Sequence, residues 1–400
     1  MQEDNSQLIE KLRRFHTIGH LLRSPLYGET KPFLDRLFSE PRVFDFPGCR
    51  PRLQSFLRIV QWNIHYGSRL EAISDALNQH PILRLADVLL MNEVDDGMSR
   101  SGNVSVTREL SLRLEANAVF GVEYLELGDP PGPPQYVGHV RKTNFAESSK
   151  SRAFLHGCAI FSRRPFSNAR AARLHRCEDN FASAEKRIGG RAAVIIDLDL
   201  PGGMVTVGGA HLDVVNTPGC RRSQMRSLLE AIDQGYPERH GRALVGGDFN
   251  THTFSNGGRL RALRNLIRIL TANEKAMKRT LLNPFDREPL LAELISAGFR
   301  IDGFNDAQAT NEIRAAELAS SAHLPVAVRK AALNRLGSHD ATLQFRLDWI
   351  ASRGLDALSE GDVIDTATGV PSINPCTIRG LTDGGLPLSD HDPIVVDVRI

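Results

Sequence analysis

LVGGDFNTH, at residues 244–252, places an apolar run with two glycines directly before Asp248 and Asn250. The apolar half has the length and composition of a buried strand, and its glycines allow a neighbouring backbone to come close. Since alternate residues of an extended segment project to the same side, Asp248 and Asn250 are expected to face a common point. We interpret Thr251 and His252 as the rim of this site. The stretch therefore predicts a central strand that ends in a pair of polar groups.

Further apolar runs of strand length recur from residue 57 to the C-terminus, with helical patterns between some of them at 69–79, 107–117 and 221–234. Two of the runs are joined by Pro-Gly-Gly at 201–203, a turn that predicts an antiparallel pair. The pattern indicates a mixed α/β layered domain and disfavours a purely parallel doubly wound sheet. The runs are LRIVQW, ADVLLMNE, CAIFS, RAAVIIDLDL, MVTVGGAHL, RALVGGDF, RLDWIAS and PIVVDVRI.

The chain is expected to divide into an N-terminal helical extension, residues 1–56, packed on a domain that covers residues 57–400. Apolar positions recur at helical spacing over residues 8–24, and this helix is predicted to end before Pro25. Residues 253–340 are predicted to form a mostly helical insertion within the domain.

Composition excludes several classes of protein. With 49 Lys and Arg against 47 Asp and Glu, the net charge is +2, so any site for a polyanion must be local. The five cysteines are scattered without a CxxC pair, which argues against a disulfide framework and predicts reduced, mostly buried thiols. We find no signal peptide and no run of the roughly 18 apolar residues that a membrane span requires. We expect a cytoplasmic protein without a membrane span, acting as a monomer.

Polar residues stand at the ends of several predicted strands. Each taken singly is typical of a turn or a helix cap, but their recurrence on several strands favours a shared site, because buried polar groups must pair with one another or with a metal. Oxygen-rich ligands without clustered cysteines suit Mg²⁺ or Mn²⁺, and such an ion activates water for attack at phosphorus. These residues are Asn63, Asn92, Glu93, His211, Asp213, Asp248, Asn250, Asp348, Asp390, His391 and Asp392.

In their order along residues 58–400, the motifs around these positions resemble the endonuclease/exonuclease/phosphatase superfamily. GDFN followed by a C-terminal SDHxP is the specific combination. The resemblance implies a four-layered α/β/β/α sandwich of two packed mixed sheets, similar to deoxyribonuclease I, with the site at one edge of the sheets. The motifs are WN at 62–63, NE at 92–93, GCAIFSRRP at 157–165, GGAHLD at 208–213, GGDFN at 246–250, LDWI at 347–350 and SDHDPI at 389–394.

The same resemblance implies a set of catalytic roles. Asp248 orients or deprotonates the attacking water, and Asn250 helps to hold that water and the phosphoryl oxygens. His391 contacts the scissile phosphate and is held by Asp348. An aspartate bonded to an imidazole favours its protonated form, so this pair would present a cation to a phosphate. His211 aligns with a histidine that serves the phosphate side of the site.

For the metal, the resemblance implies Glu93 as the principal carboxylate ligand, Asn63 beside the ion and Asp390 as a further carboxylate on the metal side. The sequence departs from the family at His65, two residues after Asn63, where some nucleases carry an acidic residue. This puts a second-metal ligand on that strand in doubt.

Three further residues are candidates for substrate binding. Arg100 and Asn103 lie in a glycine- and serine-containing loop after Glu93 that would present a guanidinium and backbone N–H groups to a second phosphate; a polar surface loop fits it equally well. His156 either binds phosphate or has a structural role. A basic stretch at 257–279 would track a nucleic-acid backbone, but a solvated helix face is the commoner case.

These observations predict a divalent-metal-dependent phosphoesterase that hydrolyses phosphodiester bonds by in-line attack of water, with nucleic acid among the possible substrates. One alternative is a phosphatase or phospholipase C-type hydrolase that acts on inositol phosphates or phospholipid head groups. A weaker alternative is a non-catalytic binding protein on the same fold.

Overall fold

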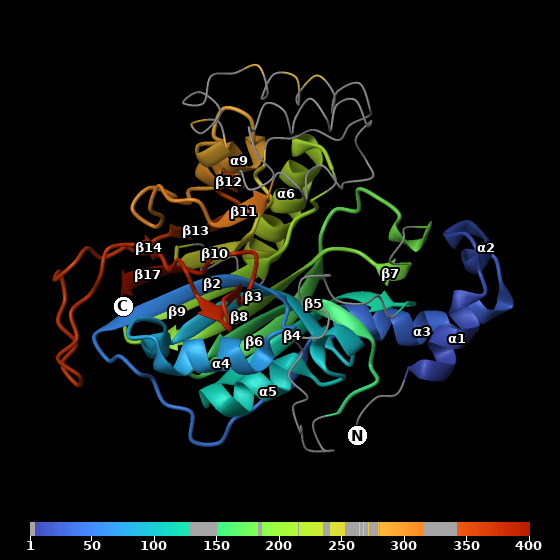
Figure 1. The fold of residues 1–400 in the computed structure, drawn as a ribbon, viewed down its shortest axis with the longest axis horizontal. Coiled ribbons are helices and arrows are strands. Elements are labelled where there is room, and N and C mark those ends of the chain that lie inside the picture. The colour runs from blue at the N-terminus through green and yellow to red at the C-terminus, as the bar shows by residue number, and fades with distance from the viewer. Residues whose placement is uncertain are drawn as a thin grey trace.

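Two mixed β-sheets form the centre of the computed structural model (Figure 1). The structure describes residues 5–128, 150–182, 186–214, 216–234, 241–252, 281–314 and 342–400, with the single residues 264, 267, 271 and 279. The predicted basic stretch at 257–279 therefore lies outside the described residues apart from single positions.

The first sheet has the order β1-β4-β5-β3-β2-β17-β14, and β7 pairs with β4. Within it, β2 and β3 run parallel, so that the predicted WN and NE motifs lie side by side, with Asn63 in register with Asn92. The strands are β1 (Arg42–Phe44), β2 (Phe56–Tyr66), β3 (Val88–Asp96), β4 (Asn117–Glu126), β5 (Leu155–Ser162), β7 (Arg187–Gly189), β14 (Cys376–Thr377) and β17 (Ile394–Arg399).

The second sheet has the order β13-β10-β9-β8-β6. Strands β8 and β9 form the antiparallel pair predicted from the Pro-Gly-Gly turn, whereas β9 and β10 are parallel. Its strands are β6 (Phe166–Arg173), β8 (Ala192–Leu200), β9 (Gly203–Ala210), β10 (Ala243–Asp248) and β13 (Asp348–Arg353). Two small pairs lie outside the main sheets, β11 (Asn311–Arg314) with β12 (Thr342–Phe345) and β15 (Thr382–Asp383) with β16 (Leu386–Pro387).

Helices cover the outer faces of both sheets. The three predicted helices are found as α4 (Leu70–Gln79), α5 (Val106–Leu114) and α6 (Pro218–Gln234), and α9 (Pro289–Ser296) packs beside α6. One apolar core joins α4 and α5 to the first sheet, a second lies between the sheets, and a third joins α6 and α9 to the second sheet. These cores separate four layers, which confirms the α/β/β/α sandwich. Short 3-10 turns lie at Leu83–Leu85, Ser99–Ser101 and Asn180–Ala182.

The N-terminal segment contains helices α1 (Ser6–Arg13), α2 (Ile18–Leu22) and α3 (Pro25–Ser39). The single predicted helix over 8–24 is thus wrong: Ser24 caps α3 by accepting a hydrogen bond from Tyr27 N, and Pro25 occupies the first turn, where its missing N–H costs nothing. Leu34 and Leu37 of α3 join the core of the first sheet. The division at residue 56 stays a prediction.

The predicted insertion at 253–340 lies largely outside the described residues, and its part at 281–314 contains α9 and β11. No helix in the described ranges is long and apolar enough to cross a membrane.

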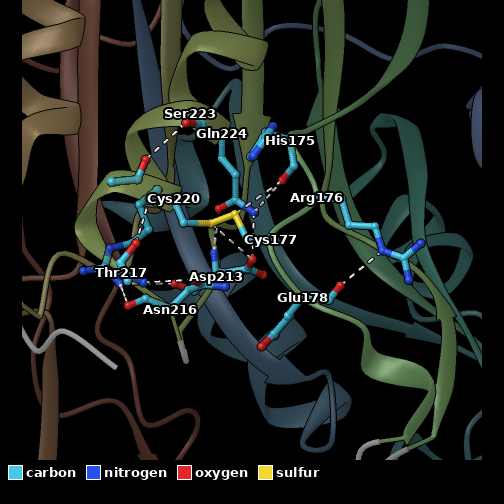
Figure 2. Close-up of a disulfide and its surroundings, with 12 residues drawn as sticks. His175, Arg176, Cys177, Glu178, Asp213, Asn216, Thr217, Cys220, Ser223 and Gln224 are labelled. Atoms are coloured by element: carbon cyan, nitrogen blue, oxygen red, sulfur yellow. Dashed lines mark hydrogen bonds between the residues drawn. A yellow bond between two sulfur atoms is a disulfide. The ribbon is translucent and has the colours of Figure 1, made fainter. Parts of the chain in front are cut away.

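Cys177 and Cys220 form a disulfide (Figure 2), so the prediction of reduced thiols is wrong for these two. They are 43 positions apart in the sequence and meet because the connection after β6 lies beside the first turn of α6. Residue spacing carries no signal for such a tertiary pairing. Cys49, Cys158 and Cys376 are free.

Candidate active site

Polar side chains from both sheets converge on one carboxylate oxygen, Oδ2 of Asp248. The amide Nδ2 of Asn63 donates to this oxygen at 3.1 Å. On other sides of it, Nε2 of His211 lies at 3.5 Å and Nε2 of His391 at 3.6 Å. All four side chains are buried. The structure therefore brings together residues that are up to 328 positions apart (391 − 63) in the sequence.

The glycines of GGDFN explain how Asp248 reaches this position. A Cβ atom on Gly247 would lie 1.8 Å from the backbone oxygen of Ala210 in β9, and a Cβ on Gly246 would lie 2.6 Å from Leu90 in the opposite sheet. Larger residues would hold β10 away from both neighbours. The two glycines therefore let the end of β10 approach β9 and the first sheet closely.

Left-handed backbone conformations concentrate at the same edge. His65 has φ 48°, Glu93 φ 53° and Asn250 φ 50°. The pairing of β3 with β2 and with β5 shifts register next to Glu93. Bulges of this kind re-aim side chains, and non-glycine residues adopt this conformation at a cost of about 1–3 kcal/mol each. The cost is typical of functional sites, where the fold imposes a side-chain direction.

Asn92 is a residue of the site whose role the sequence did not reveal. Its Oδ1 accepts hydrogen bonds from Gln61 Nε2 at 2.9 Å and from the backbone N of Asp248 at 2.8 Å. Asn92 therefore fastens the end of β10 to the first sheet. The sequence feature that could have indicated this role is the position of Asn92 next to Glu93. Neighbouring residues of a strand project to opposite faces of the sheet, so the two side chains are expected to have different partners.

His391 and Asp348 form the predicted pair, with Nδ1 of the histidine 2.7 Å from Oδ2 of the aspartate. Asp348 is the direct antiparallel partner of Asp248 across β10 and β13. The loop that carries His391 is fixed on β2, because Trp62 Nε1 donates to the His391 oxygen at 2.9 Å. Burial opposes the charged imidazole, but the carboxylates of Asp348 and Asp248 hold the pKa of His391 well above its ordinary value. The two carboxylates thus favour the protonated imidazole of His391.

The pKa of the Asp248 side chain lies near neutral pH. Burial raises its pKa to about 7, against the opposing charge of His391 and with a further rise from Asp348. Its Oδ1 accepts a hydrogen bond from Asn250 N at 3.0 Å, and Asn250 Nδ2 donates to Leu212 O at 2.9 Å. A carboxylate with a pKa near 7 suits proton transfer at neutral pH.

His211 is held neutral. Burial, reinforced by the positive charge of Arg191, keeps the pKa of His211 well below its ordinary value. Neither ring nitrogen makes a hydrogen bond with the part of the chain that the structure describes. A buried imidazole with unsatisfied nitrogens at this position fits hydrogen bonding to a bound group.

The predicted metal ligands include two carboxylates, Glu93 and Asp390, and carboxylate oxygens are donors that a hard divalent cation accepts. Asn63 Nδ2 donates to Glu93 Oε1 at 3.2 Å and to Asp248 Oδ2, so both carboxylates lie next to this amide group. The Asn63 oxygen accepts a hydrogen bond from His65 N at 3.1 Å. Asp390 has a 44% exposed side chain and lies 2.9 Å from His65 Nδ1. His65 thus contacts Asp390, a predicted metal ligand, and does not itself supply the acidic side chain that some nucleases carry at this position.

The three predicted substrate-binding residues do not share one environment. Arg100 is buried and makes two hydrogen bonds to Asp95, at 2.7 and 3.0 Å, and Asp95 also contacts His156 Nδ1 at 2.8 Å. The guanidinium of Arg100 is therefore paired with Asp95 and does not face solvent. Asn103 is exposed, with φ 55°. Their roles toward a substrate stay predictions.

Thr251 and His252 do not form a rim. Thr251 is fully buried, donates to Arg346 O at 2.6 Å and accepts from Trp349 Nε1 at 2.8 Å. His252 is buried, and its Nε2 lies 2.8 Å from Val214 O. Both residues anchor the segment that follows GDFN.

Comparisons with known proteins give the family of this chain. The model of the Endonuclease/Exonuclease/phosphatase family matches residues 60–391. Among solved structures, a family protein from Bacteroides vulgatus has 13% identity and a TM-score of 0.46, with 87% of this chain and 100% of that chain covered. One from Beutenbergia cavernae DSM 12333 has 16% identity and a TM-score of 0.44, covering 87% and 72%.

The human Nocturnin catalytic domain with bound sulfate anion has 15% identity and a TM-score of 0.42, covering 90% of this chain and 97% of that chain. No match is found among curated proteins. Because the family model covers most of the sequence and the fold is the expected sandwich, the chain belongs to the endonuclease/exonuclease/phosphatase family.

Proposed function

We propose that this protein is a divalent-metal-dependent phosphoesterase that hydrolyses phosphodiester bonds by in-line attack of water, with Mg²⁺ or Mn²⁺ as its cofactor. The observation that supports this best is the convergence of Asn63, His211 and His391 on one oxygen of Asp248. A binding protein on the same fold has no need of a carboxylate with a pKa near 7 beside a buried imidazolium. The arrangement therefore favours catalysis over binding alone.

Asp248 is the proposed base, because it is fixed from both sides and is half-protonated close to neutral pH. His391 presents its Nε2–H to a phosphoryl oxygen, since Asp348 occupies Nδ1 and stabilises the cation. His211 offers a neutral ring nitrogen on another side of Asp248, and Asn250 holds the Asp248 carboxylate in position through its backbone N–H. These groups surround the place that a scissile phosphate would take.

Glu93, with Asn63 beside it and Asp390 on the exposed side, would hold the cation. A divalent ion held there would neutralise the charge that develops on the phosphoryl oxygens. The carboxylate donors match the oxygen preference of Mg²⁺ and Mn²⁺.

The pairing of nearby arginines favours a diester over a monoester. Arg100 is bonded to Asp95, and Arg191 is bonded to Glu123 at 3.0 Å and to Asp213 at 3.2 Å. Their charges are therefore compensated within the protein. A phosphodiester carries one negative charge, whereas a monoester carries about 1.5 to 2 at neutral pH and requires more cationic partners.

The function is tested with metal-stripped protein and a panel of phosphoesters: bis-p-nitrophenyl phosphate, p-nitrophenyl phosphate, plasmid DNA, single-stranded RNA, sphingomyelin and inositol phosphates. After treatment with EDTA and its removal, we expect no turnover until Mn²⁺ or Mg²⁺ is restored, and then faster cleavage of diesters than of p-nitrophenyl phosphate. Cleavage of one natural class identifies the substrate. A protein that turns over none of these compounds with either metal contradicts the proposal.

Glu93→Gln tests the metal site separately. Replacing a ligand carboxylate with an amide weakens the attraction for a divalent cation, so we expect the Mn²⁺ concentration for half-maximal hydrolysis of bis-p-nitrophenyl phosphate to rise at least about tenfold. Mn²⁺ binding followed by electron paramagnetic resonance should weaken in parallel. The matched control, Glu360→Gln at an exposed position, should bind Mn²⁺ like the wild type. Equal Mn²⁺ affinities for both variants would remove Glu93 from the ligand set.

A further inference from the structure

The Cys177–Cys220 disulfide lies next to Asp213, and the neighbouring residue Leu212 contacts the site. The function proposed above does not use this disulfide. Cys177 belongs to the connection after β6, and Cys220 to the first turn of α6. Both cysteines are half-buried, in contrast with the fully buried Cys158. A thiol reagent in solution therefore reaches this disulfide more easily than it reaches the thiol of Cys158.

Asp213 lies directly beside the disulfide (Figure 2), with Oδ2 3.8 Å from Cys220 Sγ. Gln224, one turn along α6, accepts a hydrogen bond from Asp213 N at 3.0 Å and donates to Asp213 Oδ2 at 2.9 Å. The same Gln224 amide donates to His175 O at 3.3 Å, close to Cys177. The disulfide and Gln224 thus connect three segments: the connection after β6, helix α6 and the residues next to Asp213. We call the place where these segments meet the junction.

This junction is one peptide away from the catalytic groups. Leu212, the residue before Asp213, donates from its N to Asp248 O at 3.0 Å. Its carbonyl oxygen accepts from Asn250 Nδ2 at 2.9 Å. Leu212 therefore holds the backbone of Asp248 and the side chain of Asn250 together. A displacement of Asp213 is transmitted to both.

We propose that Cys177 and Cys220 are a reversible redox modification site that controls the geometry of Asp248 and Asn250 through Asp213 and Leu212. The effect on turnover rests on the phosphoesterase function proposed above. A dithiol reduces the bond by thiol–disulfide exchange: the S–S bond breaks, each protein sulfur gains one electron and one proton, and the dithiol becomes a cyclic disulfide. The oxidised form, in which the junction is covalently closed, is the active one.

Other contacts keep the fold intact after reduction. Arg221 Nη1 donates to Asn216 O at 3.1 Å, and it is held by a buried ion pair with Glu288 at 2.5 Å. His252 Nε2 remains 2.8 Å from Val214 O. Reduction therefore loosens the junction without unfolding the sheet. Because displacements of about 1 Å at a catalytic group have large effects on rate, we expect kcat to fall about tenfold, with KM changed less than about twofold.

The experiment compares oxidised protein with protein reduced by dithiothreitol and freed of it by gel filtration, since the reagent binds metals. Alkylation and mass spectrometry verify the two new thiols. We expect the tenfold loss of kcat on bis-p-nitrophenyl phosphate with Mn²⁺, recovery after reoxidation by oxidised glutathione, and faster hydrogen exchange at the amides of Leu212 and Asp213. The double variant Cys177→Ser/Cys220→Ser should show the low kcat and no response to dithiothreitol. The control Cys49→Ser/Cys376→Ser should respond like the wild type.

Three outcomes overturn the redox proposal: a fully reduced protein with unchanged kcat and unchanged exchange at Leu212 and Asp213, a response that persists in the Cys177→Ser/Cys220→Ser variant, or cooperative unfolding of the reduced protein at the assay temperature. If oxidised wild-type protein hydrolyses no phosphoester, the proposed function fails instead. Hydrogen exchange at Leu212 then still decides whether the disulfide controls the site geometry.

Discussion

Asp248→Asn is expected to lower kcat for bis-p-nitrophenyl phosphate in saturating Mn²⁺ by at least about a hundredfold, the scale of a positioned general base. The substitution preserves the size of the side chain but removes the group that would accept the proton of water. Burial already raises the pKa of Asp248 to about 7, so its neutral form is accessible in the native protein. We therefore expect the variant to fold, with a melting temperature close to that of the wild type.

The control for this variant is Asp356→Asn, which makes the same chemical change at an exposed carboxylate that pairs with Arg300 on the surface. It should retain wild-type kcat. If Asp248→Asn keeps more than about a tenth of the wild-type kcat while binding Mn²⁺ normally, Asp248 is not the base. Its hydrogen bonds to Asn63 and Asn250 would then have only a positioning role.

His391→Gln is expected to lower kcat by about a hundredfold as well, because glutamine can still donate to Asp348 but cannot carry the positive charge. The choice of glutamine avoids leaving the fully buried carboxylate of Asp348 without a donor. The control is His20→Gln, at an exposed position in α2. Steady-state kinetics on bis-p-nitrophenyl phosphate measures the loss.

The paired variant Asp348→Asn separates the imidazolium from its partner. If Asp348 acts by stabilising protonated His391, adding Asp348→Asn to His391→Gln should cause little further loss, because both changes remove the same cation. Losses that multiply in the double variant would show that the two residues act independently. The proposed cation would then have to be abandoned.

The order of motifs allowed the fold and the family to be predicted from sequence. GGDFN indicated a buried strand that leads to Asp248, and β10 ends at that residue. Asn250 lies beyond the strand with φ 50°, and its backbone N–H, not its side chain, bonds to Asp248. The Pro-Gly-Gly turn indicated the antiparallel pair of β8 and β9 because turn chemistry is local. Local patterns succeed where the residues that form a feature are neighbours in the chain.

The predictions that failed concern contacts between distant segments. The cysteines were expected to be reduced, but Cys177 and Cys220, which are 43 positions apart in the sequence, form a disulfide. Thr251 was interpreted as rim because the chain leaves the shared motif there, yet it is buried because Arg346 and Trp349 supply its hydrogen bonds. Burial of a polar group depends on partners that the local sequence does not contain.

The sequence by itself determined the strands, the identity of the polar residues at their ends and, through the motif order, the family. Only the tertiary structure decided that His391, His211 and Asn63 share one oxygen of Asp248, that Asn92 fastens the two sheets, and that Cys177 meets Cys220. The physical reason is that strand formation follows from local periodicity and turn chemistry, whereas protonation states and close contacts follow from burial and distance across two packed sheets. The pKa of Asp248 belongs to that assembled site.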